Sequence, residues 1–232
     1  MLPLHWFLIT PCGLCGAPLS EPRGATPTAC PACQESLCLP VAGLVGQDPM
    51  PWWGAGHYEG PLRQLLLHLR RHPRPEAVAA LGGGIARGLA VATESHERPL
   101  LVPIPSWKRQ ANPLPGLLCR ALQRHPQLGR ADLLERSRPV LGQHHLGRAL
   151  RLANQVGAFR CLRPPAAGEA HRRPVLIVDD ILTSGATVSS AAKALQQTGW
   201  RVRGVVCLAR TPWSGAAGGD LRSQSRFGDG PG

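Results

Sequence analysis

Long apolar runs are missing from this chain of 232 residues. Apolar runs such as residues 65–67 and 175–178 fall far short of the roughly 18–20 residues that a membrane-spanning helix needs. The first ten residues lack a basic segment and a small-residue cleavage site, so they make a poor signal peptide. We therefore expect a cytoplasmic protein without membrane insertion, whose cysteines stay reduced.

Lysine is also scarce. Only Lys108 and Lys193 are lysines among 26 basic residues, which leaves 24 arginines against 14 acidic residues and a net charge of +12. Residues 1–50 carry a net charge of −2, whereas residues 60–174 carry +13. Arginine presents a rigid fork that fits phosphate, so this balance indicates anionic partners, either nucleic acid or phosphorylated metabolites.

The order of apolar segments predicts an α/β protein with a small appendage. Helical spacing covers residues 58–71, 77–92, 114–124, 146–156 and 187–198, and strands are expected at 100–104, 175–178 and 202–208. Strands that alternate with helices form a parallel sheet flanked by helices. We expect a small module at 1–40, a Gly- and Pro-rich linker at 41–56, the main domain at 57–212 and a disordered tail at 213–232.

Four cysteines form two CxxC pairs near the N-terminus, Cys12 with Cys15 and Cys30 with Cys33. Each pair folds its sulfurs onto one side of a tight turn, and two turns complete a tetrahedron, so the spacing predicts a structural zinc ribbon. Scattered free thiols or disulfides are the alternative interpretation. The spare Cys38 is expected to be a small buried residue.

The strongest signal is the stretch 175–187, which reads VLIVDDILTSGAT. Two carboxylates, Asp179 and Asp180, end an apolar strand and can accept hydrogen bonds from a vicinal diol. A short polar loop then opens a helix, and its backbone N–H groups can surround an anion. Together they suit a sugar phosphate at the carboxyl edge of the sheet. An ordinary capped turn between strand and helix is the alternative.

This stretch resembles the 5-phosphoribosyl 1-diphosphate (PRPP) motif of type I phosphoribosyltransferases. The resemblance implies that Asp179 and Asp180, as the catalytic pair, contact the ribose 2- and 3-hydroxyls. It implies that the 5-phosphate is held by Thr183, Ser184, Gly185, Ala186 and Thr187. It also implies the type I phosphoribosyltransferase fold and a Mg²⁺ ion that accompanies PRPP.

The order of motifs along the whole chain points to one family within this larger group. A four-cysteine ribbon precedes Tyr58-x-Gly60-x-x-Arg63, the VPIP stretch at 102–105, a stretch from Arg136 to Phe159, and the PRPP motif. This order is similar to that of the ComF competence family, also called GntX-like, and residues 103–109 look most like its cyanobacterial branch. The segment after the VPIP stretch departs from the usual family sequence.

Two weaker groups complete the candidate site. A diphosphate loop is expected at Pro105, Ser106, Lys108 and Arg109, with a solvated basic loop as the alternative for the last two. A mobile hood over the substrate is expected at 132–150, and the candidate hood contacts are Arg138, Gln143 and Arg151.

The resemblance implies transfer of a phosphoribosyl group from PRPP to an unknown nitrogen acceptor, in the service of competence and DNA uptake. The alternative is a non-catalytic competence factor that binds single-stranded DNA or a helicase and uses the same fold as a scaffold. A purine-salvage enzyme is a third interpretation, although no base-recognition segment is identifiable.

Overall fold

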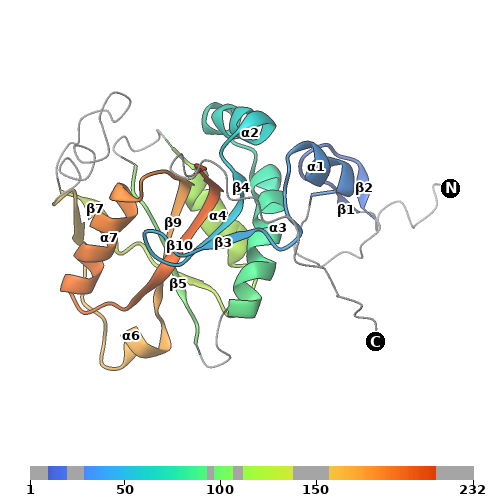
Figure 1. The fold of residues 1–232 in the computed structure, drawn as a ribbon. Coiled ribbons are helices and arrows are strands. Elements are labelled where there is room, and N and C mark those ends of the chain that lie inside the picture. The colour runs from blue at the N-terminus through green and yellow to red at the C-terminus, as the bar shows by residue number, and fades with distance from the viewer. Residues whose placement is uncertain (1–9, 20–28, 93–96, 107–111, 138–156, 213–232) are drawn as a thin grey trace, which may run out of the picture.

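The computed structural model describes residues 10–19, 29–92, 97–106, 112–137 and 157–212 (Figure 1). Within these ranges, no helix has the length and apolar character needed to cross a membrane. The predicted helix at 146–156 and the predicted tail at 213–232 lie outside the described residues.

A six-stranded sheet forms the centre of the molecule, in the order β3-β4-β10-β9-β5-β6. Its strands are β3 (Leu44–Gly46), β4 (Trp52–His57), β5 (Leu100–Pro103), β6 (Gly129–Arg130), β9 (Val175–Leu182) and β10 (Val202–Arg210). Neighbouring strands are parallel except β3 and β4, which are antiparallel. The predicted α/β architecture with a mostly parallel sheet is confirmed.

Helices cover both faces of this sheet (Figure 1). One face packs against α2 (Gly60–Arg71), α3 (Pro75–Ala92) and α4 (Leu114–Leu122), and the other against α7 (Ala186–Gln197). Strand β9 is buried from both sides: Leu176 and Val178 join the first core cluster, whereas Val175 and Ile177 join the second. Burial on both faces explains why residues 175–178 are continuously apolar.

Residues 41–56, predicted from the sequence to be a linker, contain β3 and β4 of the main sheet. Trp52 and Trp53 are buried in the two core clusters, on opposite faces of β4. Glycine is suited to this strand because a Cβ on Gly56 would lie 2.8 Å from Cδ2 of Leu62. Close packing by helix α2, and not chain flexibility, accounts for the glycine at that position.

The N-terminal module consists of the short pair β1 (Thr10–Pro11) and β2 (Pro18–Leu19), followed by α1 (Pro31–Ser36). It contacts the start of α3, where Nη2 of Arg74 donates to the Gly13 carbonyl at 3.0 Å. Leu14 packs against the first core cluster. The remaining elements of the described residues are the antiparallel pair β7 (Leu134–Arg136) and β8 (Phe159–Cys161), and the single turn α6 (Glu169–Arg172).

Candidate functional site

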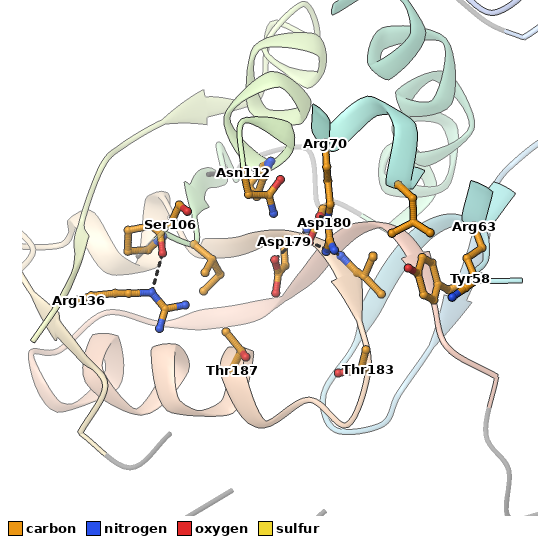
Figure 2. A pocket seen from close by; sticks show the side chains of 15 residues that line it. Tyr58, Arg63, Arg70, Ser106, Asn112, Arg136, Asp179, Asp180, Thr183 and Thr187 are labelled. Carbon is orange, nitrogen blue, oxygen red and sulfur yellow. Dashed lines mark hydrogen bonds and ion pairs between the residues drawn. The ribbon is translucent and has the colours of Figure 1, made fainter. Parts of the chain in front are cut away.

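A cavity of about 620 Å³ lies at the carboxyl ends of β5 and β9. In open α/β sheets this edge is where ligands bind. Figure 2 shows the polar side chains that line it, namely Tyr58, Arg63, Arg70, Ser106, Asn112, Arg136, Asp179, Asp180, Thr183 and Thr187. Three guanidinium groups and two carboxylates therefore face one pocket, which suits an anionic ligand that also carries hydroxyl groups.

The two carboxylates lie inside β9, because the strand continues to Leu182 and does not end at residue 178 as expected. Asp180 is only 3% exposed, and its Oδ2 accepts from Nε of Arg70 at 2.6 Å while Oδ1 accepts from the Ile181 N–H at 2.9 Å. Oδ1 of Asp179 accepts from the Asp180 N–H at 2.9 Å. Both side chains are thus fixed by local contacts.

Burial, followed by the charge of Asp180, raises the pKa of the Asp179 carboxyl from 3.8 to about 7. The nearby Arg70 guanidinium opposes this rise. The protonated form of the Asp179 side chain is therefore favoured more than in an exposed aspartate. A carboxyl group tuned to this range, in a cavity, is a common feature of functional sites.

Arg70 is a site residue that the sequence did not reveal. It lies near the end of α2, and its ion pair with Asp180 joins residues that are 110 positions apart in the chain. The repeated leucines of α2 predict a helix, but they do not indicate which arginine of that helix turns toward the sheet. No local sequence signal could have identified it.

The turn between β9 and α7 lies beside the carboxylates. Thr183 and Thr187 line the pocket, and Ser184, Gly185 and Ala186 form the backbone between them (Figure 2). Gly185 has φ +78°, a left-handed conformation that L side chains rarely adopt. Arg210 donates to the carbonyls of Leu182 and Thr183, so the turn is held from the neighbouring strand β10.

Arg136 forms the opposite wall. Its Nε donates to the Pro105 carbonyl at 2.9 Å, and its guanidinium lies 4.7 Å from the centre of the Phe159 ring and points into the pocket (Figure 2). Burial lowers the pKa of this guanidinium, and Nη1 is buried without a hydrogen-bond partner among the described residues. Such a group is ready to bind an anion, because an unpartnered buried donor is costly.

Of the predicted diphosphate loop, Pro105 and Ser106 line the pocket. Lys108 and Arg109 lie outside the described residues, as do the predicted hood residues Arg138, Gln143 and Arg151.

The four cysteines of the two CxxC pairs meet in the N-terminal module, with their sulfur atoms all within 4.8 Å of one another. The Sγ atoms of Cys12 and Cys33 are 4.0 Å apart, and those of Cys15 and Cys30 are 3.6 Å apart. A tetrahedral zinc site with Zn–S bonds near 2.3 Å places its sulfurs about 3.8 Å apart. The four residues can hold a metal such as zinc, and four thiolates would leave no open position on it.

Backbone contacts favour the thiolate form of Cys12, whereas burial raises the pKa of the Cys33 thiol. Burial alone would raise the pKa of the Cys12 thiol, but backbone hydrogen bonds from Cys15, Cys30 and Leu14 outweigh it and lower that pKa to about 6. The thiolate is the form that binds metals. The spare Cys38 is exposed and has φ +51°, so the expectation that it is buried is wrong.

Comparisons with known proteins give relatives of nearly equal length, although no family model matches the chain. It is 31% identical over 225 residues to the DNA utilization protein YhgH of Salmonella typhi, and the match covers 89% of this chain and 92% of the relative. The YhgH protein of Escherichia coli K12 is 31% identical over 222 residues, with the same coverage.

The chain belongs to the YhgH family of DNA utilization proteins. This finding agrees with the ComF/GntX-like family expected from the sequence. Because the match to YhgH covers 89% of the chain, it cannot be confined to the cysteine module or to the pocket alone.

Proposed function

We propose that the protein binds PRPP in the pocket at the carboxyl edge of the sheet and transfers its phosphoribosyl group to a nitrogen acceptor, as a type I phosphoribosyltransferase. One observation carries the proposal: Asp179 and Asp180 adjoin the turn that opens α7, inside a cavity with three arginines. Carboxylates that can accept from ribose hydroxyls therefore lie next to the start of a helix, whose N–H groups can bind a phosphate.

The arrangement suggests how the ligand would lie. The turn at residues 183–187 would hold the 5-phosphate through its backbone N–H groups and the hydroxyls of Thr183 and Thr187. Asp179 would accept from the ribose hydroxyls, because Asp180 is already bound by Arg70 and the Ile181 N–H. The diphosphate would extend toward Ser106 and Arg136, where the buried Nη1 offers a donor.

In the transfer step, the bond between ribose C1 and the diphosphate oxygen breaks, and diphosphate leaves with the electron pair. The acceptor nitrogen then donates its lone pair to C1 and loses a proton. Positive charge develops on the ribose ring in the transition state, as in glycoside hydrolysis. The ionised form of Asp179 would stabilise that charge, and Arg136 would stabilise the negative charge on the leaving diphosphate.

Mg²⁺ would enter with PRPP. Apart from the four cysteines, no cluster of three potential metal-ligating side chains occurs among the described residues. Within the described ranges, three of the four carboxylate oxygens of Asp179 and Asp180 have hydrogen-bond partners. The ion would supply charge neutralisation on the diphosphate oxygens.

We also propose that the cysteine cluster binds one structural zinc ion and that the protein works in the reducing cytoplasm, where such thiols persist. The relatives are named DNA utilization proteins, so we propose that the transferase serves DNA uptake or use in competence. Assignment to the cyanobacterial-type branch remains a prediction from residues 103–109.

Isothermal titration calorimetry with PRPP and Mg²⁺ tests the pocket. We expect saturable binding, abolished or weakened more than tenfold by Asp179→Asn. Glu76→Gln is the matched control, because Glu76 is an exposed carboxylate outside the pocket. The absence of both heat and a thermal shift with PRPP would overturn the proposal.

A measurement of diphosphate release distinguishes the transferase from the alternative, a non-catalytic binding factor. If PRPP binds but no diphosphate appears with any of a panel of free bases and amines, the fold serves as a ligand-binding scaffold in a non-catalytic DNA- or helicase-binding factor.

A further inference from the structure

A second group of arginines lies at the opposite edge of the sheet from the pocket. Arg98 precedes β5, Arg172 and Arg173 precede β9, and Arg201 and Arg203 lie at the start of β10. Because β5, β9 and β10 are adjacent and parallel, their amino ends meet at one edge, near α6 in Figure 1. We call these five residues the amino-edge arginines. None of them lines the pocket.

Contacts between the three chain segments hold this edge together. The Arg98 N–H donates to the Arg172 carbonyl at 2.9 Å, and Nη2 of Arg201 donates to the His171 carbonyl at 3.3 Å. Both Arg201 and Arg203 bind the carboxylate of Glu97, which is only 1% exposed. The backbone of segments 98 and 172 is therefore joined, and Glu97 fixes the guanidiniums of Arg201 and Arg203 beside it.

The amino-edge arginines carry an excess of positive charge. Segments 97–98, 171–173 and 201–203 contain five arginines and one acidic residue, Glu97, which gives a net charge of +4. Arg98, Arg172 and Arg201 are exposed, whereas Glu97 is buried beneath the guanidiniums that bind it. A polyanion that approaches this edge meets guanidinium groups first.

We propose that the amino-edge arginines bind the phosphate backbone of DNA. Planar guanidinium forks match phosphate oxygens, and an array of several is suited to a repeating polyanion. Trp200, beside Arg201, is only 2% exposed and offers no ring for base stacking. Recognition would therefore rest on phosphate charge and would not depend on base sequence. The relatives are named DNA utilization proteins, which favours DNA over an acidic protein as the partner.

The binding should be measured with a fluorescein-labelled 20-mer of thymidine by anisotropy, from 50 to 300 mM NaCl. With two of the five arginines paired to Glu97, we expect about three to four phosphate contacts, and hence a slope of log K against log salt of about −2 to −3. Arg98→Gln combined with Arg172→Gln should weaken binding by about tenfold at 100 mM NaCl and reduce the steepness of the slope by about 1.4.

The matched control combines Arg71→Gln with Arg160→Gln. It removes the same charge from exposed arginines on α2 and β8, away from the amino edge, and should stay within twofold of the parent protein. The thermal unfolding midpoints of both double variants establish that they are folded. If the edge variant does not fold, Arg172→Glu alone should weaken binding at least fivefold.

Three results would overturn the proposal: no binding of the oligonucleotide, equal losses in the edge and control variants, or displacement of the oligonucleotide by saturating PRPP. The last would place the DNA in the pocket instead. Failure of PRPP to bind would leave this experiment unaffected, so the two proposals can fail separately.

Discussion

Removal of the Arg70 guanidinium should destabilise both the fold and the pocket. In the Arg70→Met variant, the buried Asp180 carboxylate loses a partner at 2.6 Å and keeps the Ile181 N–H. Breaking a fully buried ion pair costs about 3–5 kcal/mol. The Arg70 side chain is 34% exposed, so water compensates in part, and we expect a loss of about 2 kcal/mol in the free energy of unfolding.

A double-mutant cycle with Asp180→Asn isolates the pairwise part of that loss. Urea unfolding at pH 7.5 can be followed by tryptophan fluorescence, because Trp52, Trp53 and Trp200 are buried and become exposed on unfolding. We expect the double variant to be less destabilised than the sum of the single variants, by about 1–2 kcal/mol. Arg71→Met is the matched control, because Arg71 follows Arg70 in α2 and is exposed.

The same change should weaken PRPP binding in a pH-dependent way. The Arg70 charge lowers the pKa of Asp179, so its loss raises that pKa further and leaves less of the ionised form at neutral pH. Recovery of affinity on raising the pH from 7 to 9 is therefore expected in Arg70→Met. The reasoning is refuted if Arg70→Met and Arg71→Met lose equal stability, or if the coupling in the cycle is near zero.

Three further predictions concern other parts of the structure. Cys15→Ser should reduce bound zinc from one ion per chain to well below one, measured by elemental analysis. Because folding raises the pKa of Asp179 from 3.8 to about 7, the free energy of unfolding should fall between pH 4 and 7 by at most about 1.4 kcal/mol per pH unit, and Asp179→Asn should remove this fall in urea titrations. Gly185→Ala places a Cβ against Cγ of Pro49 at φ +78° and should lower the melting temperature, whereas Gly116→Ala, with open space around it, should not.

Local patterns were sufficient to predict the elements that carry the candidate site. The apolar strand, the turn and α7 are continuous in sequence, and both CxxC pairs form their turns within a few residues. In each case the chemistry lies in one short segment, so spacing alone indicates the geometry. The helices at 58–71 and 77–92 were predicted because burial on one side imposes a period of 3.6 residues.

Strands β3 and β4 could not be predicted from the sequence, and the reason is physical. The segment Trp52–His57 is buried on both faces and contains two glycines, so it shows neither alternation nor a run of branched residues. Its place in the sheet is set by β10, which pairs with it from 153 positions away: Val205 lies beside Trp52 and Val206 beside Trp53. The Arg70–Asp180 ion pair could not be predicted for the same reason, because a contact across the fold leaves no pattern in either local segment.

The structure places one group of arginines at each of two opposite edges of the sheet, and this separation has an energetic consequence. Strand β9 runs from Val175 at the amino edge to Leu182 at the pocket edge, a length of about 23 Å at 3.3 Å per residue. Charges in 0.1 M salt are screened beyond about 10 Å. PRPP in the pocket and DNA at the amino-edge arginines would therefore repel each other little. We expect saturating PRPP to change the affinity for the thymidine 20-mer by less than twofold, which allows one protein to hold both anions at the same time.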